Sequence, residues 1–296
     1  MDASVTGETA EGKGDTLNPS FAFGGEPAGA ARQKRDRVSP FPSAVLLIEH
    51  LSYTYPDGTQ ALRDVSLQVE AGHCVGLIGP NGAGKSTLLL HLNGTLRGEG
   101  RVLVDGLEVT KANLPEIRRR VGLIFQDSDH QLFMPTVFDD VAFGPLNLGL
   151  SEEEVRRRVA ESLRVVGKEE FRERAPYHLS GGEKRAVAIA TVLAMEPRVL
   201  VMDEPTSSLD HRSRRSLIEL LKSLPITKMI TTHDLELILE LCCRCVLMNE
   251  GEIVADGPTR DLLGDERLLA RFGMEAPHSL IPHPHGRPGN KGGASH

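Results

Sequence analysis

The sequence predicts an α/β protein built around a parallel β-sheet. Two short runs, HCVGLIG at 73–79 and RVLVMDE at 198–204, are largely apolar and lead into turns marked by Gly or Pro, as is typical of strands buried on both faces. The stretch SEEEVRRRVAESLRVVG has Ser151 at an N-cap position, Glu154 three residues later and Gly167 at its end, which predicts an α-helix. Buried strands that alternate with helices favour a parallel sheet.

Further elements are expected along the chain. AVLLIEHLSYTY, from Ala44, predicts a strand that ends in the turn Pro56-Asp57-Gly58, and ALRDVSLQVE predicts another before Ala71-Gly72. TLLLHLNG, from Thr87, has a helical pattern, and KMITT predicts a strand. FQDSDHQLFMPTVFDDVAFG, residues 125–144, has no regular helical period and is expected to be a loop.

Composition divides the chain into three parts. Residues 1–43 are rich in Gly, Ala, Ser, Pro and charge, and are predicted to be a disordered tail. Residues 44–274 form the predicted folded domain, and 275–296 are rich in His, Pro and Gly. The His283-Pro284-His285 run in that second tail has the ligand type for a transition metal, although a flexible polar extension is the favoured interpretation.

Charge and hydropathy argue against some functional classes. The formal net charge is −7, so no general attraction to nucleic acid or anionic lipid is expected. The longest apolar runs are far shorter than the roughly 20 residues needed to cross a bilayer. The N-terminus resembles no secretion signal, so a soluble chain in the cytoplasm is expected.

The four cysteines are Cys74 and the cluster Cys242, Cys243 and Cys245. Such a cluster has the ligand type for a soft metal ion, but zinc sites usually use spaced CxxC pairs with two further ligands. The favoured interpretation is that these are small apolar residues of an intracellular core.

The strongest motif is GPNGAGKST, Gly79 to Thr87, which fits G-x-x-x-x-G-K-[ST]. It follows an apolar strand and precedes a helical stretch, as a phosphate-binding loop requires. Its glycines let successive backbone N–H groups converge on phosphate oxygens at the positive end of the following helix. Lys85 is expected to bind the β- and γ-phosphates, and Ser86 to ligate Mg²⁺.

An acidic pair follows the strand RVLVM. Asp203 ends that strand and Glu204 is its neighbour. A carboxylate at a strand end beside a phosphate loop binds Mg²⁺, and the adjacent carboxylate polarises the attacking water. The pair is common at protein surfaces, and the phosphate loop is what makes it informative.

A second anion-receptive helix start lies in LSGGEKRAVAIA, Leu179 to Ala190. Ser180, Gly181 and Gly182 begin a helix that Arg185 and Ala186 continue. One chain does not need two phosphate cradles for one nucleotide. The second cradle is therefore expected to serve the ATP of another chain.

These motifs together resemble the ATP-binding-cassette (ABC) ATPases, from Leu46 to near Phe272. The resemblance implies a P-loop NTPase (RecA-like) parallel-sheet core with an N-terminal antiparallel β subdomain and an inserted α-helical subdomain at about 128–182. It also implies a head-to-tail dimer, of two copies or with a related ATPase, that sandwiches two ATP molecules.

The resemblance assigns roles to single residues. Tyr55 matches the aromatic residue that stacks on adenine. Gln126 matches the glutamine that senses Mg²⁺ and the attacking water, and Asp203 matches the metal aspartate. Mg²⁺ is thus expected at Ser86, Gln126 and Asp203.

Three more positions match the catalytic and inter-subunit parts of the family pattern. Glu204 matches the catalytic glutamate, His233 in TTHD the histidine that contacts the γ-phosphate, and Asp210 in SSLD the inter-subunit loop. The expected ATP-binding residues are then Tyr55, Gly79, Pro80, Asn81, Gly82, Ala83, Gly84, Lys85, Ser86 and Thr87 of one subunit, with Ser180, Gly181, Gly182 and Asp210 of the other.

Two positions depart from the family pattern. Glu183 stands where many members have Gln and adds a negative charge beside Ser180. His211 follows Asp210 where Pro is frequent, which puts the rigidity of that loop in doubt.

The stretch that follows Gln126 is similar to that of energy-coupling-factor importers, especially those for cobalt and nickel. The resemblance implies a transmembrane coupling subunit, a substrate-capture membrane protein and a place at the cytoplasmic face of the membrane. Leu132, Phe133 and Phe143 are expected to pack against the coupling subunit or to be core of the helical subdomain. Asp139 and Asp140 are expected to be available to basic residues of that partner.

Other functions stay open within the same family. A vitamin-importing energy-coupling-factor ATPase is one alternative, and a soluble cassette that acts as a regulatory or assembly switch is another. Chromosome-organising members contain long coiled coils and translation factors usually carry two cassettes; neither pattern fits this chain.

Overall fold

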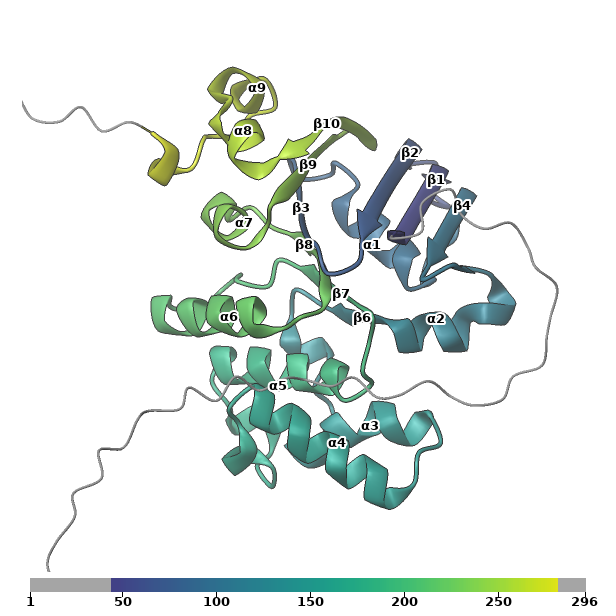
Figure 1. Cartoon of the computed structure of the whole chain (residues 1–296), viewed down its shortest axis with the longest axis vertical. Helices are drawn as coiled ribbons and strands as arrows, with labels where there is room; N and C mark the ends of the chain where they lie inside the picture. The colour runs from purple at the N-terminus through teal and green to yellow at the C-terminus, as the bar shows by residue number, and fades with distance from the viewer. Residues whose placement is uncertain (1–43, 282–296) are drawn as a thin grey trace, which may run out of the picture. The chain divides into compact units, whose positions relative to one another are not determined.

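Two β-sheets form the centre of the protein in the computed structural model, which describes residues 44–281 (Figure 1). A four-stranded sheet has the order β2-β1-β4-β5, and a six-stranded sheet the order β10-β9-β3-β8-β7-β6. The strands are β1 (Ala44–Thr54), β2 (Gln60–Glu70), β3 (Cys74–Ile78), β4 (Glu99–Val104), β5 (Leu107–Glu108), β6 (Val121–Ile124), β7 (Val199–Asp203), β8 (Thr227–Thr231), β9 (Arg244–Asn249) and β10 (Glu252–Pro258).

The smaller sheet is antiparallel and comes from the N-terminal part of the described chain. In β2 the side chains of Val65, Leu67 and Val69 are buried while those of Ser66 and Glu70 are exposed. This alternation buries one face and leaves the other to water. It confirms the predicted antiparallel β subdomain.

The larger sheet is parallel from β9 to β6, and only its edge strand β10 is antiparallel. Residues 199–202 of β7 are all buried, as are residues 227–231 of β8. Continuous burial means that both faces of the sheet are covered, which explains the apolar runs in the sequence. The predicted parallel-sheet core is confirmed.

Helices cover both faces of the larger sheet. In Figure 1, α6 to α9 lie on one side of it, and α1 and α2 lie on the other side with the antiparallel sheet. The helices are α1 (Lys85–Leu92), α2 (Leu114–Arg120), α3 (Val137–Asn147), α4 (Glu152–Val165), α5 (Gly181–Leu193), α6 (His211–Ser223), α7 (Leu235–Leu241), α8 (Thr259–Gly264) and α9 (Glu266–Arg271).

A separate group of helices, α3 to α5, packs around its own apolar core (Figure 1). The fully buried side chains of Val137, Val141, Val159 and Val187 belong to that core. The group corresponds to the predicted helical subdomain, and its residue limits stay a prediction.

The helix predicted from Ser151 is present as α4. The Ser151 hydroxyl accepts a hydrogen bond from the backbone N–H of Glu154 at 3.3 Å, and Gly167 adopts a φ of 63° after the helix. Glycine is favoured there because a left-handed φ costs it little. The second bond of a capping box, from the Ser151 N–H to the Glu154 carboxylate, is not formed, because that carboxylate binds Arg157 and Arg158 instead.

The prediction of a loop over residues 125–144 is wrong for the second part of that stretch. Helix α3 begins at Val137 and contains both Phe143-Gly144 and Pro145. The Thr136 hydroxyl caps it by accepting the N–H of Asp139 at 3.1 Å. Proline near the end of this short helix removes only one intrahelical donor, so it does not stop the helix there.

The expectation for Asp140 is also wrong. Its side chain is buried, and one carboxylate oxygen accepts the N–H groups of Phe133 and Met134, each at 3.0 Å. Asp140 thus holds the chain that precedes α3 and is not available to a partner. Leu132 is buried in the helical core, whereas Phe133 and Phe143 are exposed.

The cysteines mostly follow the favoured interpretation. Cys242 and Cys245 are buried, Cys74 is half-buried and Cys243 is exposed. Within residues 44–281, no three His, Cys, Asp or Glu side chains are placed to hold a metal ion. Over the same range, every helix is too short or too polar to cross a bilayer. The 1–43 tail and the His283-Pro284-His285 run lie outside the described residues.

Candidate nucleotide site

Four neighbouring parallel strands bring the predicted residues to one edge of the larger sheet. β3 leads into the phosphate loop, β6 leads to Gln126, β7 ends at Asp203, and β8 leads to His233. Parallel strands place their carboxyl ends at the same edge, and ligands of open α/β sheets bind there. The meeting of residues far apart in sequence follows from this strand order.

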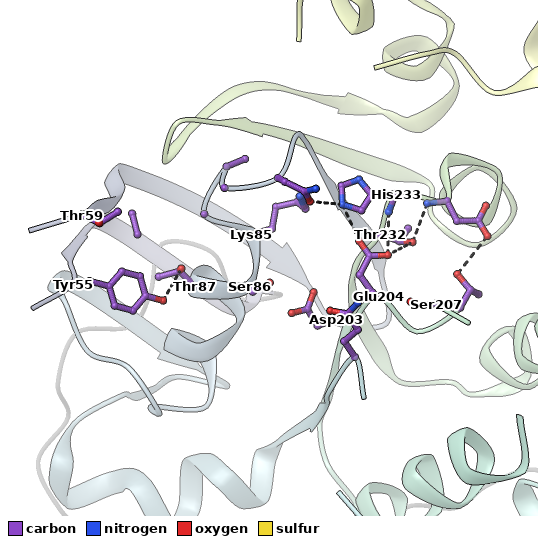
Figure 2. Close-up of a pocket in the computed structure, with 18 of the residues that line it drawn as sticks. Tyr55, Thr59, Lys85, Ser86, Thr87, Asp203, Glu204, Ser207, Thr232 and His233 are labelled. Carbon is purple, nitrogen blue, oxygen red and sulfur yellow. Dashed lines mark hydrogen bonds and ion pairs between the residues drawn. The ribbon is translucent and has the colours of Figure 1, made fainter. Parts of the chain in front are cut away.

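A cavity of about 720 Å³ lies at this edge (Figure 2). Twelve of the predicted residues line it, together with seven that the sequence did not single out. The predicted ones are Tyr55, Asn81, Gly82, Ala83, Gly84, Lys85, Ser86, Thr87, Gln126, Asp203, Glu204 and His233. The others are Thr59, Gln60, Ala61, Thr206, Ser207, Thr232 and Asp234.

The phosphate loop needs glycine at two places. Gly79 and Gly84 adopt φ values of 143° and 97°, which side chains rarely adopt. A Cβ at Gly79 would overlap the carbonyl oxygen of Met248, and one at Gly84 would overlap that of Ala61. Close approach of neighbouring backbone therefore explains both glycines.

Lys85 is buried at the first turn of α1 and reaches back over its own loop. Its ammonium donates to the carbonyl oxygens of Gly79 at 2.7 Å and Pro80 at 2.9 Å. Burial lowers the pKa of Lys85, and the negative charges of Glu204 and Asp203 oppose that shift. Because an ammonium has three donors, one is left for an anion in the cavity.

Glu204 is held by the strand and loop beside it. Its φ is 46°, in the left-handed region, and its N–H donates to the Thr231 carbonyl oxygen at 2.9 Å. One carboxylate oxygen accepts the Thr232 hydroxyl at 3.0 Å and the His233 N–H at 3.2 Å. A left-handed non-glycine residue costs about 1–3 kcal/mol, and these bonds offset that strain while fixing the carboxylate in the cavity.

His233 connects the acidic side of the cavity with the phosphate loop. Its Nε2 lies 2.9 Å from the Asn81 side-chain oxygen and 3.4 Å from a Glu204 oxygen. Figure 2 shows Glu204 and His233 on the side of the cavity opposite Tyr55. The Tyr55 hydroxyl lies 3.0 Å from the Thr87 hydroxyl.

Asp203 and Asp234 have different surroundings. The Asp203 carboxylate accepts the hydroxyl of Thr231. Asp234 binds the Arg214 guanidinium at 2.7 Å and caps α7. Burial alone would raise the pKa of Asp234, but Arg214 and the N–H of Leu237 outweigh it and the net shift is downward. Asp234 therefore acts as a fixed anion that holds the loop after His233.

Ser180 and Asp210 do not line this cavity. Ser180 caps α5 and forms a full capping box with Glu183, whose carboxylate accepts both the N–H and the hydroxyl of Ser180 at 2.8 Å. Asp210 caps α6 by accepting the N–H of Ser213 at 2.8 Å. The side chains of Glu183 and His211 thus fit ordinary helix starts. No single chain brings the two predicted phosphate cradles together.

Arg185 is a residue whose importance the sequence did not indicate. Its buried guanidinium donates to the carbonyl oxygens of Phe125, at 2.6 Å, and of Gln126. It therefore links the helix that begins at Ser180 to the loop that carries Gln126. Its burial, which a single sequence does not display, is what creates the need for acceptors.

Comparisons with known proteins agree with this geometry. The ABC transporter family profile matches residues 62–207. An ABC transporter ATP-binding protein of Geobacter sulfurreducens is 54% identical over 80% of this chain and 95% of its own length. The energy-coupling factor transporter ATP-binding protein EcfA of Methanothermobacter thermautotrophicus is 50% identical over 78% of this chain and 76% of its own.

A third relative and two solved structures extend the similarity. The cobalt import ATP-binding protein CbiO of Rhodobacter capsulatus is 48% identical over 79% of this chain and 85% of its own. CbiO1 of Clostridium perfringens, part of the transporter complex cbiONQ, superposes with a TM-score of 0.70 at 36% identity over 77% of this chain and 94% of its own. A dimeric ATP-binding cassette bound to ADP and Pi gives 0.65 at 30% identity over 72% and 98%.

Proposed function

Because the chain belongs to the ABC transporter family of ATP-binding proteins, we propose that it is the ATP-hydrolysing subunit of an energy-coupling-factor importer for cobalt or nickel ions. The chain binds ATP, and its hydrolysis is coupled to transport. The finer points are the site residues, Mg²⁺, the dimer, the membrane partners and the cargo, and each is argued separately below.

The chemistry of the cavity supports ATP hydrolysis. Lys85 and the loop N–H groups present positive charge to the phosphates, and Glu204 lines the same cavity. Glu204 is positioned to orient a water molecule and accept its proton as the water attacks the γ-phosphate. His233, fixed between Asn81 and Glu204, is positioned to donate to a γ-phosphate oxygen.

Mg²⁺ fits the oxygen donors of the cavity. Ser86, Gln126 and Asp203 all line it, and hydroxyl, amide and carboxylate oxygens are the ligands that this ion prefers. When bound, Mg²⁺ would neutralise charge on the β- and γ-phosphates. We assign those three side chains to its site.

The position of the Ser180 helix start supports a head-to-tail dimer. Its helix start lies away from the nucleotide cavity, and the capping box engages the N–H groups of Ser180 and Glu183, so the N–H groups of Gly181 and Gly182 are the ones offered to the phosphate of a second subunit. A solved relative is described as a dimer bound to ADP and Pi. A matching arrangement here would build each complete site from two chains, either two copies or one copy and a related ATPase.

The relatives' names support the importer assignment and its cargo. EcfA is named for energy-coupling factor transport and CbiO for cobalt import. Phe133 and Phe143, which pack edge to face with centroids 5.2 Å apart, form an exposed aromatic pair on the helical subdomain. We assign this pair to contact with a transmembrane coupling subunit at the cytoplasmic face of the membrane, where a substrate-capture protein would supply the cargo.

The cluster of Glu204, Thr232 and His233 is the observation that carries the hydrolytic assignment, and Glu204→Gln tests it. The amide cannot accept the proton, so turnover should fall about 10²- to 10⁴-fold while ATP binding persists. Phosphate release and ATP-dependent dimerisation, followed by size-exclusion chromatography, check both effects. Unchanged turnover would remove Glu204 from the role of base.

The transport assignment has its own test. Phe133→Ala with Phe143→Ala should weaken co-purification with a multi-span coupling protein encoded beside this chain, and leave ATP binding intact. Tyr177→Ala is the matched control, because Tyr177 is an exposed aromatic residue of the same subdomain. No such partner gene, or no complex with it, would favour a soluble switch.

Cargo is decided by uptake in cells. Cells that depend on this system should accumulate labelled cobalt or nickel, and the Glu204→Gln variant should abolish that uptake. Uptake of a vitamin, without uptake of either metal, would instead identify a vitamin importer of the same type.

A further inference from the structure

Two thiols outside the nucleotide cavity meet although they are 168 positions apart. The Sγ atoms of Cys74 and Cys242 are 3.1 Å from each other. Cys74 is the first residue of β3, and Cys242 directly follows α7. Parallel pairing of β3 with β9, in which Val75 is opposite Arg244, places the two cysteines side by side.

We propose that Cys74 and Cys242 are a modification site at which mild oxidation forms a reversible disulfide. A disulfide requires the sulfur atoms at about 2.05 Å, so each need move only by about half an ångström from its present position. The strand ladder already holds both backbones, and no large movement of the chain is needed.

The two thiols differ in a way that suits this chemistry. A hydrogen bond from Cys242 and the charge of Lys228 hold the pKa of Cys74 below its usual value, although burial opposes this. The same hydrogen bond and burial raise the pKa of Cys242. Cys74 is half-buried and has the lower pKa, so it is the better placed of the two to attack an oxidant as the thiolate, and the buried Cys242 is the partner thiol that follows.

Hydrogen peroxide serves as the oxidant. The Cys74 thiolate attacks one peroxide oxygen, the O–O bond breaks, and Cys74 becomes a sulfenic acid while hydroxide leaves and becomes water. The Cys242 sulfur then attacks the Cys74 sulfur, and the displaced hydroxide leaves as a second water with the Cys242 proton. Two electrons pass from the two thiols to one peroxide molecule, and a dithiol reverses the change.

The bond would tie together two parts of the nucleotide site. β3 runs from Cys74 into the phosphate loop, and α7 runs from the loop of His233 to Cys242. A cross-link over such a long loop restricts the unfolded chain and raises the melting temperature. The oxidised protein is therefore expected to melt at a higher temperature than the reduced protein.

Cys243 is the matched control for this pair. It is exposed and adjacent to Cys242, yet its sulfur lies 3.9 Å from the Cys74 carbonyl oxygen and bonds to neither thiol. An exposed thiol reacts readily when accessibility alone decides the outcome. If Cys74 pairs with the buried Cys242 and not with Cys243, the short distance between the two sulfur atoms, and not accessibility, has decided the outcome.

The experiment treats the full chain with hydrogen peroxide, blocks free thiols, and maps linked peptides by mass spectrometry. We expect a Cys74–Cys242 peptide and a higher melting temperature, both reversed by dithiothreitol. Cys243→Ser should keep both effects, and Cys242→Ala should lose both. Cys74→Ala provides a second loss variant, and ATP binding checks that each variant is folded.

Three results would overturn the proposal. These are a vicinal Cys242–Cys243 link in place of the expected peptide, dimers linked through Cys243, or unmodified Cys74 after oxidation that modifies Cys243. Loss of the Cys74–Cys242 peptide in a folded Cys243→Ser protein would have the same meaning.

Discussion

Lys85 is held by its own loop and keeps one donor for the phosphate that we propose it binds. Two of its donors bind the carbonyl oxygens of Gly79 and Pro80, which keeps the ammonium over the loop. Burial favours the neutral amine, and the nearby carboxylates Asp203 and Glu204 favour the cation. The ammonium is thus held in place by the protein's own groups, as the proposed contact with a phosphate requires.

Lys85→Ala should weaken ATP binding about tenfold to a hundredfold, because a hydrogen bond to a charged group contributes about 1.5–3 kcal/mol. Titration with a fluorescent ATP analogue measures the change. Lys222→Ala is the control, since Lys222 lies on the surface of α6 and pairs with Glu219 and Glu240. An unchanged dissociation constant for Lys85→Ala would contradict the phosphate-loop assignment.

Arg185 supports a second prediction at this scale. Arg185→Met removes both bonds to the carbonyl oxygens of Phe125 and Gln126, so the loop that carries Gln126 should lose its fixed position. ATP binding should be kept because Arg185 does not line the cavity. The rate of hydrolysis should fall, and the free energy of unfolding, measured in urea, should fall by about 1–3 kcal/mol. Wild-type turnover in a folded variant would show that this link is dispensable.

At the scale of elements, α3 explains the wrong prediction for residues 125–144. The sequence did contain its start, because Thr136 and Asp139 have the spacing of a helix cap. Val137, Val141 and Pro145 are buried at intervals of four, which is a helical period. Gly144 and Pro145 disfavour a helix locally, but packing of this buried face outweighs that cost.

Asp140 gives a prediction about this element. Asp140→Leu leaves the N–H groups of Phe133 and Met134 without their acceptor, so it should lower the free energy of unfolding by about 1–3 kcal/mol or more. Asp140→Asn keeps a side-chain oxygen and should lose less. Urea unfolding of both variants measures the difference, and equal losses would mean that these two bonds contribute little.

The pH dependence of that comparison has a definite sign. Burial raises the pKa of Asp140 in the folded state, more than the bonds from Phe133 and Met134 lower it. The unfolded chain therefore ionises first as the pH rises, which favours unfolding. As the pH rises above the usual aspartate pKa, about 4, the free energy of unfolding of wild type should fall, whereas that of Asp140→Asn should not show this fall. The fall should end once the folded carboxyl has ionised. The opposite slope would contradict the raised pKa.

At the scale of the whole molecule, the two helix starts that the sequence predicts to bind phosphate line separate cavities within residues 44–281. The phosphate loop lines the nucleotide cavity, and Ser180 and Gly182 line another. The head-to-tail dimer that we propose would resolve this separation, because each cradle would then meet its counterpart on the second chain.

Mixing two inactive variants tests this arrangement. Lys85→Ala disables the phosphate loop, and Gly181→Glu places a negative charge at the other cradle, where a Cβ meets no atom within 4 Å. Each variant alone should be inactive. An equal mixture should recover about a quarter of wild-type turnover, since half the dimers are mixed and each contains one intact site. No recovery, with mixed dimers shown to form, would mean that the two cradles do not cooperate between chains.

The local features of this protein were determined by its sequence. The phosphate loop, the strand before it and the helix after it, the helix from Ser151 and the acidic pair at Asp203 all depend on nearby residues and on apolar periodicity, which a single sequence displays. The family resemblance added the antiparallel sheet and the helical subdomain, and the structure confirmed both.

Only the tertiary structure decided which side chains meet. Strand order brings Asn81, Glu204 and His233 together and pairs Cys74 with Cys242, while packing of α5 joins Arg185 to the Gln126 loop. These contacts cross up to 168 positions of sequence, and no local period or spacing records them. They form because burial of each apolar face against a distant one selects a single packing.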